Sequence, residues 1–247
     1  MSKLAFIFPG QGAQKAGMGK DFYENSEAAR SFFDQAQKIL DFDLKEMCFG
    51  EHEELNLTEY TQPCMVSVCL AIVQELKKRG INPDITAGLS LGEYAAVAAA
   101  GGMNELDAIK LVRRRGILMQ STVPAGEGAM AAVLGLDAKK IEEILESFEN
   151  VWIANYNCPG QIVITGLTNE VQQASLALKE AGAKRVVELK VSGPFHSLLL
   201  KPAGEALLKE MESMSFSTLQ VPYVANATAE IVTDSKKIST FFAKGIY

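Results

Sequence analysis

A single serine stands between two glycines, directly after a short apolar run and directly before an alanine-rich one. The stretch is GLSLG, residues 88–92, between a strand-like run over 85–89 and a helical pattern that ends near residue 100. Strands that lead into helices in this way are typical of α/β proteins, in which helices cover a parallel sheet. Glycine on both sides of the serine predicts a strained turn against which other backbone packs closely.

Apolar runs and helical patterns also alternate elsewhere in the chain. Residues 4–8 form a short apolar run that ends at Pro-Gly, which is the pattern of a buried parallel strand. Helical patterns follow over about 21–40 and 62–79, and another covers about 104–120. We therefore predict a parallel sheet with helices on both faces.

Residues 126–191 show a different order of predicted strands and helices. Their patterns follow the order strand, helix, strand, strand, helix, strand, which is that of a ferredoxin-like unit. We therefore predict a large α/β domain made of residues 1–125 and 192–247, with a small ferredoxin-like domain, residues 126–191, inserted into it. A helix over 202–214 and a strand in VPYVANAT belong to the part that follows the insertion.

Composition excludes several classes of protein. The 247 residues are 48% hydrophobic and 22% charged, as is usual for a soluble globular protein, and the net charge of −6 argues against general nucleic-acid binding. The apolar run in residues 1–8 is too short for a signal peptide, and no apolar run is long enough for a membrane span. We expect a cytoplasmic protein. Four cysteines without C-x-x-C spacing and only two histidines predict neither a zinc site nor a disulfide framework.

GLSLG is a G-x-S-x-G pattern, and it has the context that a nucleophilic serine elbow needs, with a strand before it and a helix after it. Ser90 is then the candidate nucleophile. The amide of Leu91 would point toward a developing oxyanion at the helix N-terminus. A glycine-rich turn whose serine only caps the helix is an equal alternative from the pentapeptide alone.

A nucleophilic serine needs a base, and the sequence offers His52 and His196. His52 lies in the acidic stretch FGEHEELNLTE, which is typical of a solvated loop or helix. His196 lies in VSGPFHSLLLKPA, just after the predicted insertion, where glycine and proline indicate a tight return to the large domain. That position suits a residue facing an interdomain cleft. A lone histidine is more often structural, but with a serine elbow present His196 is the candidate base.

The loop after the first strand, FPGQGAQKAGMG, is neither a dinucleotide fingerprint nor a phosphate loop. Lys15 stands where the third glycine of a dinucleotide fingerprint belongs, and the Gly-Lys-Ser/Thr of a phosphate loop is absent. A loop of small residues beside the elbow can supply a second oxyanion amide, from Gln11. A simple tight turn is as good an interpretation of this segment alone.

Three successive arginines, Arg113 to Arg115, lie in a predicted helix. Such a run is usually a solvated face. Helical spacing places Arg115 on a stripe with Leu111 and Leu118, so Arg115 is the arginine that we expect to turn inward, with Arg113 and Arg114 in solvent. A buried guanidinium needs an anion, and its fork fits a carboxylate. This predicts an acyl substrate that carries a free carboxylate.

Together these segments resemble the malonyl-CoA:acyl carrier protein transacylase family. The matching segments occur in family order over roughly residues 3–238 and are FPGQGAQ, GLSLGEY, RRRGILMQ, GAMAAVLGL, NYNCPGQIVITG, AGAKRVVELKVSGPFHS and VANATAE. The resemblance implies an α/β-hydrolase-like large domain with a ferredoxin-like insertion. It also implies that Ser90 is the nucleophile, His196 the general base, Gln11 and Leu91 the oxyanion amides, and Arg115 the partner of the malonyl carboxylate.

The activity implied is ping-pong transfer of a malonyl group from malonyl-CoA to the phosphopantetheine thiol of acyl carrier protein, in fatty acid biosynthesis. Phe195 is similar to the bulky residue of malonyl-selecting members, and Asn157, in a loop of the small domain, is a further candidate at the cleft. We expect a monomer that needs no metal or redox cofactor and has no nucleic-acid or membrane partner.

Two features depart from the family pattern. Leu89 stands where many members have histidine, at a position that an elbow turns away from the chemistry. After about Ile238 the segment STFFAKGIY does not resemble the family, and we find no glutamine-bearing segment whose backbone carbonyl would orient the catalytic histidine. We therefore expect an incomplete or altered C-terminus, which would affect the setting of His196, stability and activity.

Two other functions stay open. A serine esterase or thioesterase-type hydrolase needs an acidic third triad member between Ser90 and His196 in the chain. The sequence offers no clear candidate for that acid, and the hydrolase would leave Arg115 unexplained. An inactive remnant or binding module is the other alternative, and the departure at the C-terminus motivates it.

Overall fold

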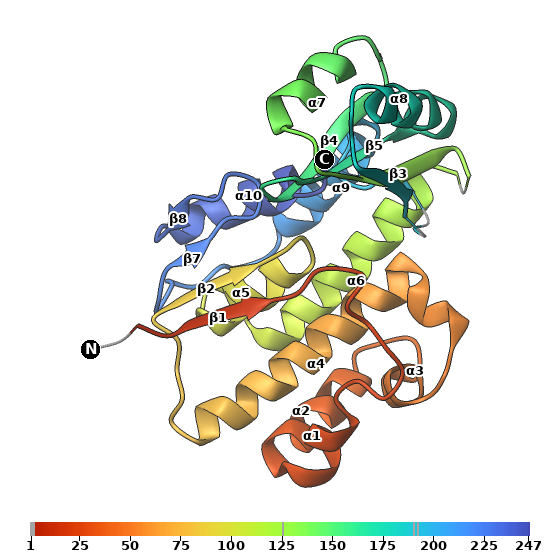
Figure 1. Cartoon of the computed structure of the whole chain (residues 1–247). Coiled ribbons are helices and arrows are strands. Elements are labelled where there is room, and N and C mark those ends of the chain that lie inside the picture. The colour runs from red at the N-terminus through yellow and green to blue at the C-terminus, as the bar shows by residue number, and fades with distance from the viewer. Residues whose placement is uncertain (1–2, 125, 190, 192) are drawn as a thin grey trace. The chain divides into compact units, whose positions relative to one another are not determined.

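The computed structural model describes residues 3–124, 126–189, 191 and 193–247. It contains two compact units (Figure 1). The first comprises Met1–Ile117 and Leu207–Gly245, and the second comprises Leu118–Ala206 with Ile246–Tyr247. The predicted insertion lies within the second unit, and the domain boundaries given above stay a prediction.

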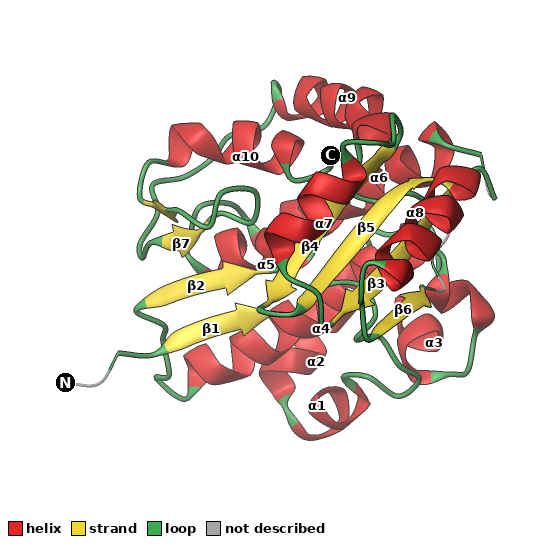
Figure 2. Cartoon of the chain, turned by 45° about the horizontal axis from the view of Figure 1, so that its top comes forward, coloured by secondary structure: helices red, strands yellow, loops and turns green. Residues whose placement is uncertain are grey.

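The first unit is built on a four-stranded sheet. In sheet order, its strands are β1 (Ala5–Phe8), β2 (Ile85–Gly88), β7 (Tyr223–Val224) and β8 (Ile231–Val232). β1 and β2 run parallel and side by side along their whole length (Figure 2), and β2 pairs with β7 in parallel. The predicted parallel sheet is confirmed for these strands. β8 was not predicted, and it joins the sheet antiparallel to β7 through a short hairpin.

Helices surround this sheet. Those of the first unit are α1 (Lys20–Asn25), α2 (Glu27–Gln37), α3 (Leu44–Phe49), α4 (Thr58–Lys78), α5 (Gly92–Ala99) and α10 (Ile238–Lys244), with 3-10 turns η1 (Glu53–Asn56) and η3 (Ser235–Lys237). Helices α6 (Glu105–Thr122) and α9 (Lys201–Met211) each run from one unit into the other. Every residue of α5 is buried, and apart from Glu93 its residues are small, apolar or aromatic.

The helix predicted over 21–40 is two helices. Ser26 separates them because its backbone is extended and its hydroxyl accepts a 3.1 Å hydrogen bond from the Ala29 amide. A serine in that position caps the second helix and ends the first. Each helix in the described part of the chain is too short or too polar to cross a bilayer.

The second unit has its own sheet, in which every pair of neighbouring strands is antiparallel. In sheet order, its strands are β4 (Val151–Cys158), β5 (Gln161–Leu167), β3 (Gly128–Leu134) and β6 (Arg185–Glu188). Helices α7 (Ala138–Leu145) and α8 (Thr168–Glu180) cover one face (Figure 1). Alternate residues of β3 and β5 pack against them, because successive side chains of a strand point to opposite faces.

The prediction that Arg113 lies in solvent is wrong. Arg113 is only 9% exposed, and it donates from Nε and Nη2 to the two carboxylate oxygens of Asp41, each at 3.0 Å. Its Nη1 donates to a carboxylate oxygen of Glu59 at 3.0 Å. The guanidinium also lies over the rings of Phe42 and Tyr60, 5.3 and 4.8 Å from their centroids. Arg113 therefore joins α6 to α4 and to the loop before α3.

Successive helical residues point about 100° apart, so three neighbouring arginines must face three directions. Arg113 faces α4. Arg114 is half-exposed and pairs with Glu210 of α9 at 2.6 Å, as expected for the solvated side of the helix. Arg115 turns inward, as its apolar stripe predicted.

We expect Arg113→Ala to lower the free energy of unfolding by about 2–4 kcal/mol, because it removes a buried side chain together with its charged hydrogen bonds and its contacts with two aromatic rings. Arg114→Ala removes the same charge from the same helix at a half-exposed site, and we expect it to cost at most about 1 kcal/mol. Urea unfolding of both variants measures the difference. Equal losses would show that Arg113 has no special structural role.

Candidate active site

Ser90 lies in the turn between β2 and α5 with a left-handed backbone, at φ 52°. A side chain at either neighbouring glycine would collide with backbone. A Cβ at Gly88 would lie 2.0 Å from the carbonyl group of Gly92, and a Cβ at Gly92 would lie 2.5 Å from the carbonyl oxygen of Phe8. The strained turn predicted from the two glycines is present, and both glycines are there because the backbone leaves no space for a side chain.

The turn is held by residues far away in the sequence. The Ser90 amide donates to Oδ1 of Asn226 at 2.9 Å, and the Asn226 amide donates to Oε1 of Glu93 at 3.0 Å. Asn226 follows β7, and parallel pairing brings the carboxyl ends of β2 and β7 to the same edge of the sheet. Sequence analysis missed both Asn226 and Glu93. A polar residue directly after a predicted neighbouring parallel strand is the sequence signal that could have identified Asn226.

One candidate oxyanion amide belongs to this turn, and the other belongs to the loop after β1. Leu91 is buried directly before α5, among the helix N-terminal amides that have no acceptor within the helix. Gln11 follows β1 and Gly10, and a Cβ at Gly10 would lie 3.1 Å from the carbonyl oxygen of Leu89. The loop that carries Gln11 is thus packed against the elbow. Leu89 itself is 46% exposed, and its Cγ and Cδ2 would also lie 3.1 Å from a Cβ at Gly10.

Arg115 is the most deeply buried cation near Ser90. It is 1% exposed, and its Nη2 donates to Ser90 Oγ at 2.9 Å and to the carbonyl oxygen of Gly245, at the end of α10, at 3.3 Å. Its Nε and Nη1 are buried and form no well-aligned hydrogen bond among the described residues. Burial lowers the pKa of this guanidinium, although the nearby Tyr94 hydroxyl acts to raise it. Two unpaired donors on a buried cation make a site for an anion with two oxygens.

Aromatic side chains complete the surroundings of Arg115. Cζ of Arg115 lies 5.5 Å from the ring centroid of Tyr94, and that ring stacks on Phe242 of α10 with centroids 4.0 Å apart. A cation over an aromatic face is stabilised by the electron density of the ring, and most strongly where water is excluded. Helix α10, which sequence analysis did not predict, therefore forms part of the wall behind the candidate acyl site.

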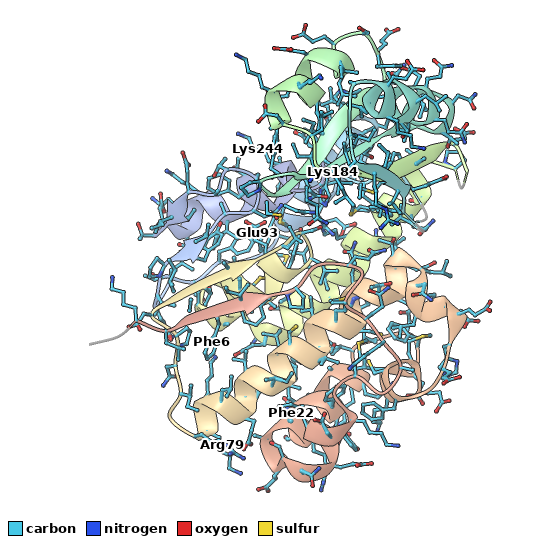
Figure 3. The ribbon with its side chains drawn as sticks, viewed as in Figure 1. Phe6, Phe22, Arg79, Glu93, Lys184 and Lys244 are labelled. Carbon is cyan, nitrogen blue, oxygen red and sulfur yellow. The ribbon has the colours of Figure 1, made fainter. Side chains whose placement is uncertain are left out.

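Glu93 is a second buried ionisable group beside the elbow. It lies in the first turn of α5 (Figure 3) and is 1% exposed. Burial raises the pKa of its carboxyl group from 4.5 to about 7, against the opposing effects of the Asn226 amide and of the Arg115 charge. A carboxyl group kept at this depth needs a compensating interaction, and the Asn226 amide supplies one.

The second unit contains the other predicted site residues. His196 is half-buried and has a left-handed backbone, at φ 59°; Ser90, His196 and Ala229 are the described non-glycine residues with positive φ. Phe195 is buried. Asn157 is exposed near the end of β4, in a strand rather than in the loop we expected. Ser90 and His196 belong to different units, and their pairing stays a prediction.

The segment before His196 is fixed within its own unit. A Cβ at Gly128 of β3 would lie 2.2 Å from the Pro194 ring, so the ring occupies the space that the glycine leaves. The Ser197 hydroxyl donates to the Pro194 carbonyl oxygen at 2.7 Å. The tight turn predicted from glycine and proline is present. His52, by contrast, lies in a loop as expected, with Nε2 3.1 Å from Glu46 Oε1.

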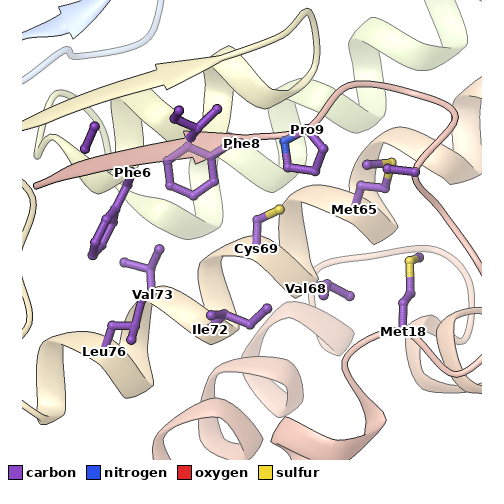
Figure 4. Close-up of a pocket in the computed structure, with 13 residues that line it drawn as sticks. Phe6, Phe8, Pro9, Met18, Met65, Val68, Cys69, Ile72, Val73 and Leu76 are labelled. Carbon is purple, nitrogen blue, oxygen red and sulfur yellow. The ribbon is translucent and has the colours of Figure 1, made fainter.

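An apolar pocket of about 390 Å³ lies between β1 and α4 (Figure 4). Its lining residues are Ala5, Phe6, Ile7, Phe8, Pro9, Ala13, Met18, Met65, Val68, Cys69, Ile72, Val73 and Leu76. Neither Ser90 nor Arg115 is among them, and no charged side chain is. The side chains that line this pocket provide no charge and no strong hydrogen-bond donor for a carboxylate or a thioester. The candidate active site is therefore the elbow and not this pocket.

The raised pKa of Glu93 predicts a pH-dependent effect of Glu93→Gln on stability. Between about pH 4.5 and 7 the unfolded carboxyl group has lost its proton while the folded one keeps it, so wild-type stability falls as the pH rises through that window. A glutamine side chain does not titrate, so the variant does not lose stability in this way. The variant should therefore gain on the order of 3 kcal/mol relative to wild type between pH 4.5 and 8. Urea unfolding of both proteins at several pH values measures this gain, and a difference that is constant with pH would contradict it.

Comparisons with known proteins give the family of the chain. Residues 5–243 match the acyl transferase domain family. The chain is 45% identical, over 252 aligned positions, to the malonyl CoA-acyl carrier protein transacylase of Bacillus subtilis (strain 168), covering 100% of this chain and 80% of that protein. The corresponding protein of Staphylococcus aureus (strain MSSA476) is 43% identical, with 100% and 81% covered.

Solved structures agree with the sequence relatives. An acyl carrier protein S-malonyltransferase from Vibrio cholerae matches with a TM-score of 0.96 and 40% identity, covering 100% of this chain and 82% of that one. A malonyl-transacylase in complex with a type II polyketide acyl carrier protein matches with a TM-score of 0.96 and 38% identity, covering 100% and 81%.

The family match runs to residue 243, beyond Ile238, where sequence analysis placed the end of the resemblance. That earlier limit was wrong. The segment forms α10, and its contacts near Arg115, through a carbonyl group and an aromatic ring, follow no simple motif that sequence analysis could recognise. A match over nearly the whole chain, with relatives above 40% identity, shows that the chain belongs to the acyl transferase family and, within it, to the malonyl-CoA:acyl carrier protein transacylases.

Proposed function

We propose that this acyltransferase moves a malonyl group from malonyl-CoA to the phosphopantetheine thiol of an acyl carrier protein, through a malonyl ester on Ser90, in fatty acid biosynthesis. One observation carries the proposal. Arg115 donates to Ser90 Oγ at 2.9 Å and keeps two further buried donors unpaired. The names of the relatives, which include malonyl-CoA and acyl carrier protein, support the same donor and acceptor.

In the first step Ser90 Oγ attacks the thioester carbon of malonyl-CoA while His196 takes the hydroxyl proton. The tetrahedral oxyanion is stabilised by the amides of Gln11 and Leu91. The C–S bond then breaks, and the CoA sulfur leaves with the proton from His196. A malonyl ester on Ser90 remains.

In the second step the carrier thiol gives its proton to His196 and its sulfur attacks the ester carbon. The C–O bond breaks, Ser90 Oγ takes the proton back, and malonyl-carrier leaves. Neither step changes an oxidation state, and the proposal includes no metal or cofactor.

The choice of malonyl rests on Arg115. In a malonyl ester, the ester carbonyl carbon and one methylene separate Ser90 Oγ from the carboxylate carbon, so the carboxylate stays within a few bonds of the guanidinium. The free Nε and Nη1 donors can then form a two-point contact with its oxygens. Phe195 disfavours a branched acyl chain, and Asn157 is a further candidate substrate contact.

We propose, in addition, that the second unit is ferredoxin-like and the first α/β-hydrolase-like. The strand order β4-β5-β3-β6, with α7 and α8 on one face, supports the first description. The serine turn between a parallel strand and a helix supports the second. Cytoplasmic location and a monomeric state, with no membrane partner, stay predictions from the sequence.

Incubation with malonyl-CoA followed by intact-mass and peptide analysis tests the function. We expect wild type to gain one malonyl group on Ser90 and Ser90→Ala to gain none. Release of CoA without an adduct would indicate a hydrolase, and neither adduct nor release would indicate an inactive protein. An adduct that persists on another residue of Ser90→Ala would contradict the proposed nucleophile.

Arg115→Ala tests the acyl specificity. Loss of a charge-assisted contact in a buried site costs about 2–5 kcal/mol, so malonylation should slow by at least roughly 30-fold. Acetyl-CoA has no carboxylate, and its use should stay level or rise. Arg114→Ala removes the same charge from a half-exposed position and is the matched control. Rates of acyl-enzyme formation with both thioesters decide the matter: equal losses for malonyl and acetyl groups would make Arg115 structural.

A further inference from the structure

We propose that Asn226 and Glu93 are positioning residues that hold Ser90 in its reactive geometry. We call these two residues, with the hydrogen bond from Ser90 to Asn226 and the one from Asn226 to Glu93, the elbow relay. The inference rests on the proposed function of Ser90 as the nucleophile. It adds two residues that contact neither the acyl group nor the thiol in that mechanism.

The relay is a closed ring. The Ser90 amide donates to Asn226 Oδ1 at 2.9 Å, the Asn226 amide donates to Glu93 Oε1 at 3.0 Å, and Glu93 follows Ser90 by three residues in the chain. The ring ties the turn to β7 on one side and to the first turn of α5 on the other. Displacement of Ser90 would therefore break at least one of these hydrogen bonds.

The loop that carries Asn226 is itself closed. The Ala225 amide donates to the Glu230 carbonyl oxygen at 2.9 Å, where the chain turns from β7 into β8. The backbone that carries the Asn226 side chain is therefore held in place, and Oδ1 is a fixed acceptor for the Ser90 amide. A rigid acceptor is what a strained turn needs, because a left-handed serine costs about 1–3 kcal/mol and persists only where its surroundings hold it.

The burial of Glu93 also calls for an explanation. Its Oε2 lies against Gly245, and Arg115 donates to the carbonyl of the same Gly245. No side chain of the described residues forms an ion pair with Glu93 within 4.0 Å. A buried carboxyl group without an ion pair is costly, and hydrogen bonds offset only part of that cost. The hydrogen bond from the Asn226 amide is the one that ties Glu93 to the elbow.

Arg115 and the relay act on different atoms of Ser90. Arg115 reaches Oγ, and the relay reaches the backbone amide. Loss of Arg115 should impair the binding of a carboxylate, whereas loss of the relay should impair the attack by Oγ and leave substrate affinity nearly intact. This separation gives the relay a kinetic signature that general destabilisation does not have.

The test is single-turnover acylation by malonyl-CoA. We expect Asn226→Ala to slow the saturated rate by about 10- to 100-fold, with the half-saturating concentration changed less than about threefold, because small misplacement of a nucleophile has effects of this size. Glu93→Ala should behave alike, and Glu93→Gln, which keeps an acceptor oxygen, should recover most of the rate. Thr228→Ser, exposed in the same loop and keeping the hydroxyl that accepts from the Glu230 amide, should match wild type.

The double variant Glu93→Ala/Asn226→Ala gives an independent check. Two residues that act through one relay are not additive, so the double variant should lose no more than the slower single variant. Urea unfolding is measured for each protein, and if Glu93→Ala does not fold, Asn226→Ala and Glu93→Gln decide the question.

Two outcomes would overturn the relay: an unchanged rate in folded Asn226→Ala, or Glu93→Gln as slow as Glu93→Ala. In either case a malonyl adduct on Ser90 of wild type, in the same assay, shows that the proposed function stands. Absence of that adduct would instead mean that the proposed function has failed.

Discussion

The close approach of backbone at Gly88 and Gly92 determines where the groups around Ser90 lie. With no side chain at either position, the carbonyl of Phe8 presses against the start of α5, and β2 turns at once into that helix. Ser90 is forced into a left-handed backbone and Leu91 becomes the residue before the helix. The loop after β1 is brought against the same turn. One steric constraint thus brings together the candidate nucleophile and the segments that carry both candidate oxyanion amides.

The second organising element is the buried charge of Arg115. A guanidinium that is 1% exposed and has two donors without a well-aligned partner is costly to bury. The Tyr94 ring and the Gly245 carbonyl offset part of that cost. A substrate carboxylate would satisfy the remaining donors. Under the proposed function, this arrangement would favour a dicarboxylic acyl group over an acetyl group on electrostatic grounds, in agreement with the family to which the chain belongs.

Local signals predicted the parts of the site that local geometry decides. Glycine spacing predicted the strained turn, and helical periodicity predicted that Arg115 points inward. Contacts that depend on distant segments were missed: Asn226 reaches Ser90 only because β7 pairs with β2, and Gly245 reaches Arg115 only because α10 packs beside α5. Arg113 was misplaced for the same reason, since its carboxylate partners lie in segments whose proximity no spacing reveals.

A crystal structure of the malonyl-Ser90 intermediate would test the central claim most directly. The account predicts that the malonyl carboxylate accepts two hydrogen bonds from Arg115, at about 2.7–2.9 Å, with Ser90 still bonded to Asn226 through its amide. A carboxylate in solvent or bound to a different cation, with the Arg115 guanidinium unchanged, would contradict it.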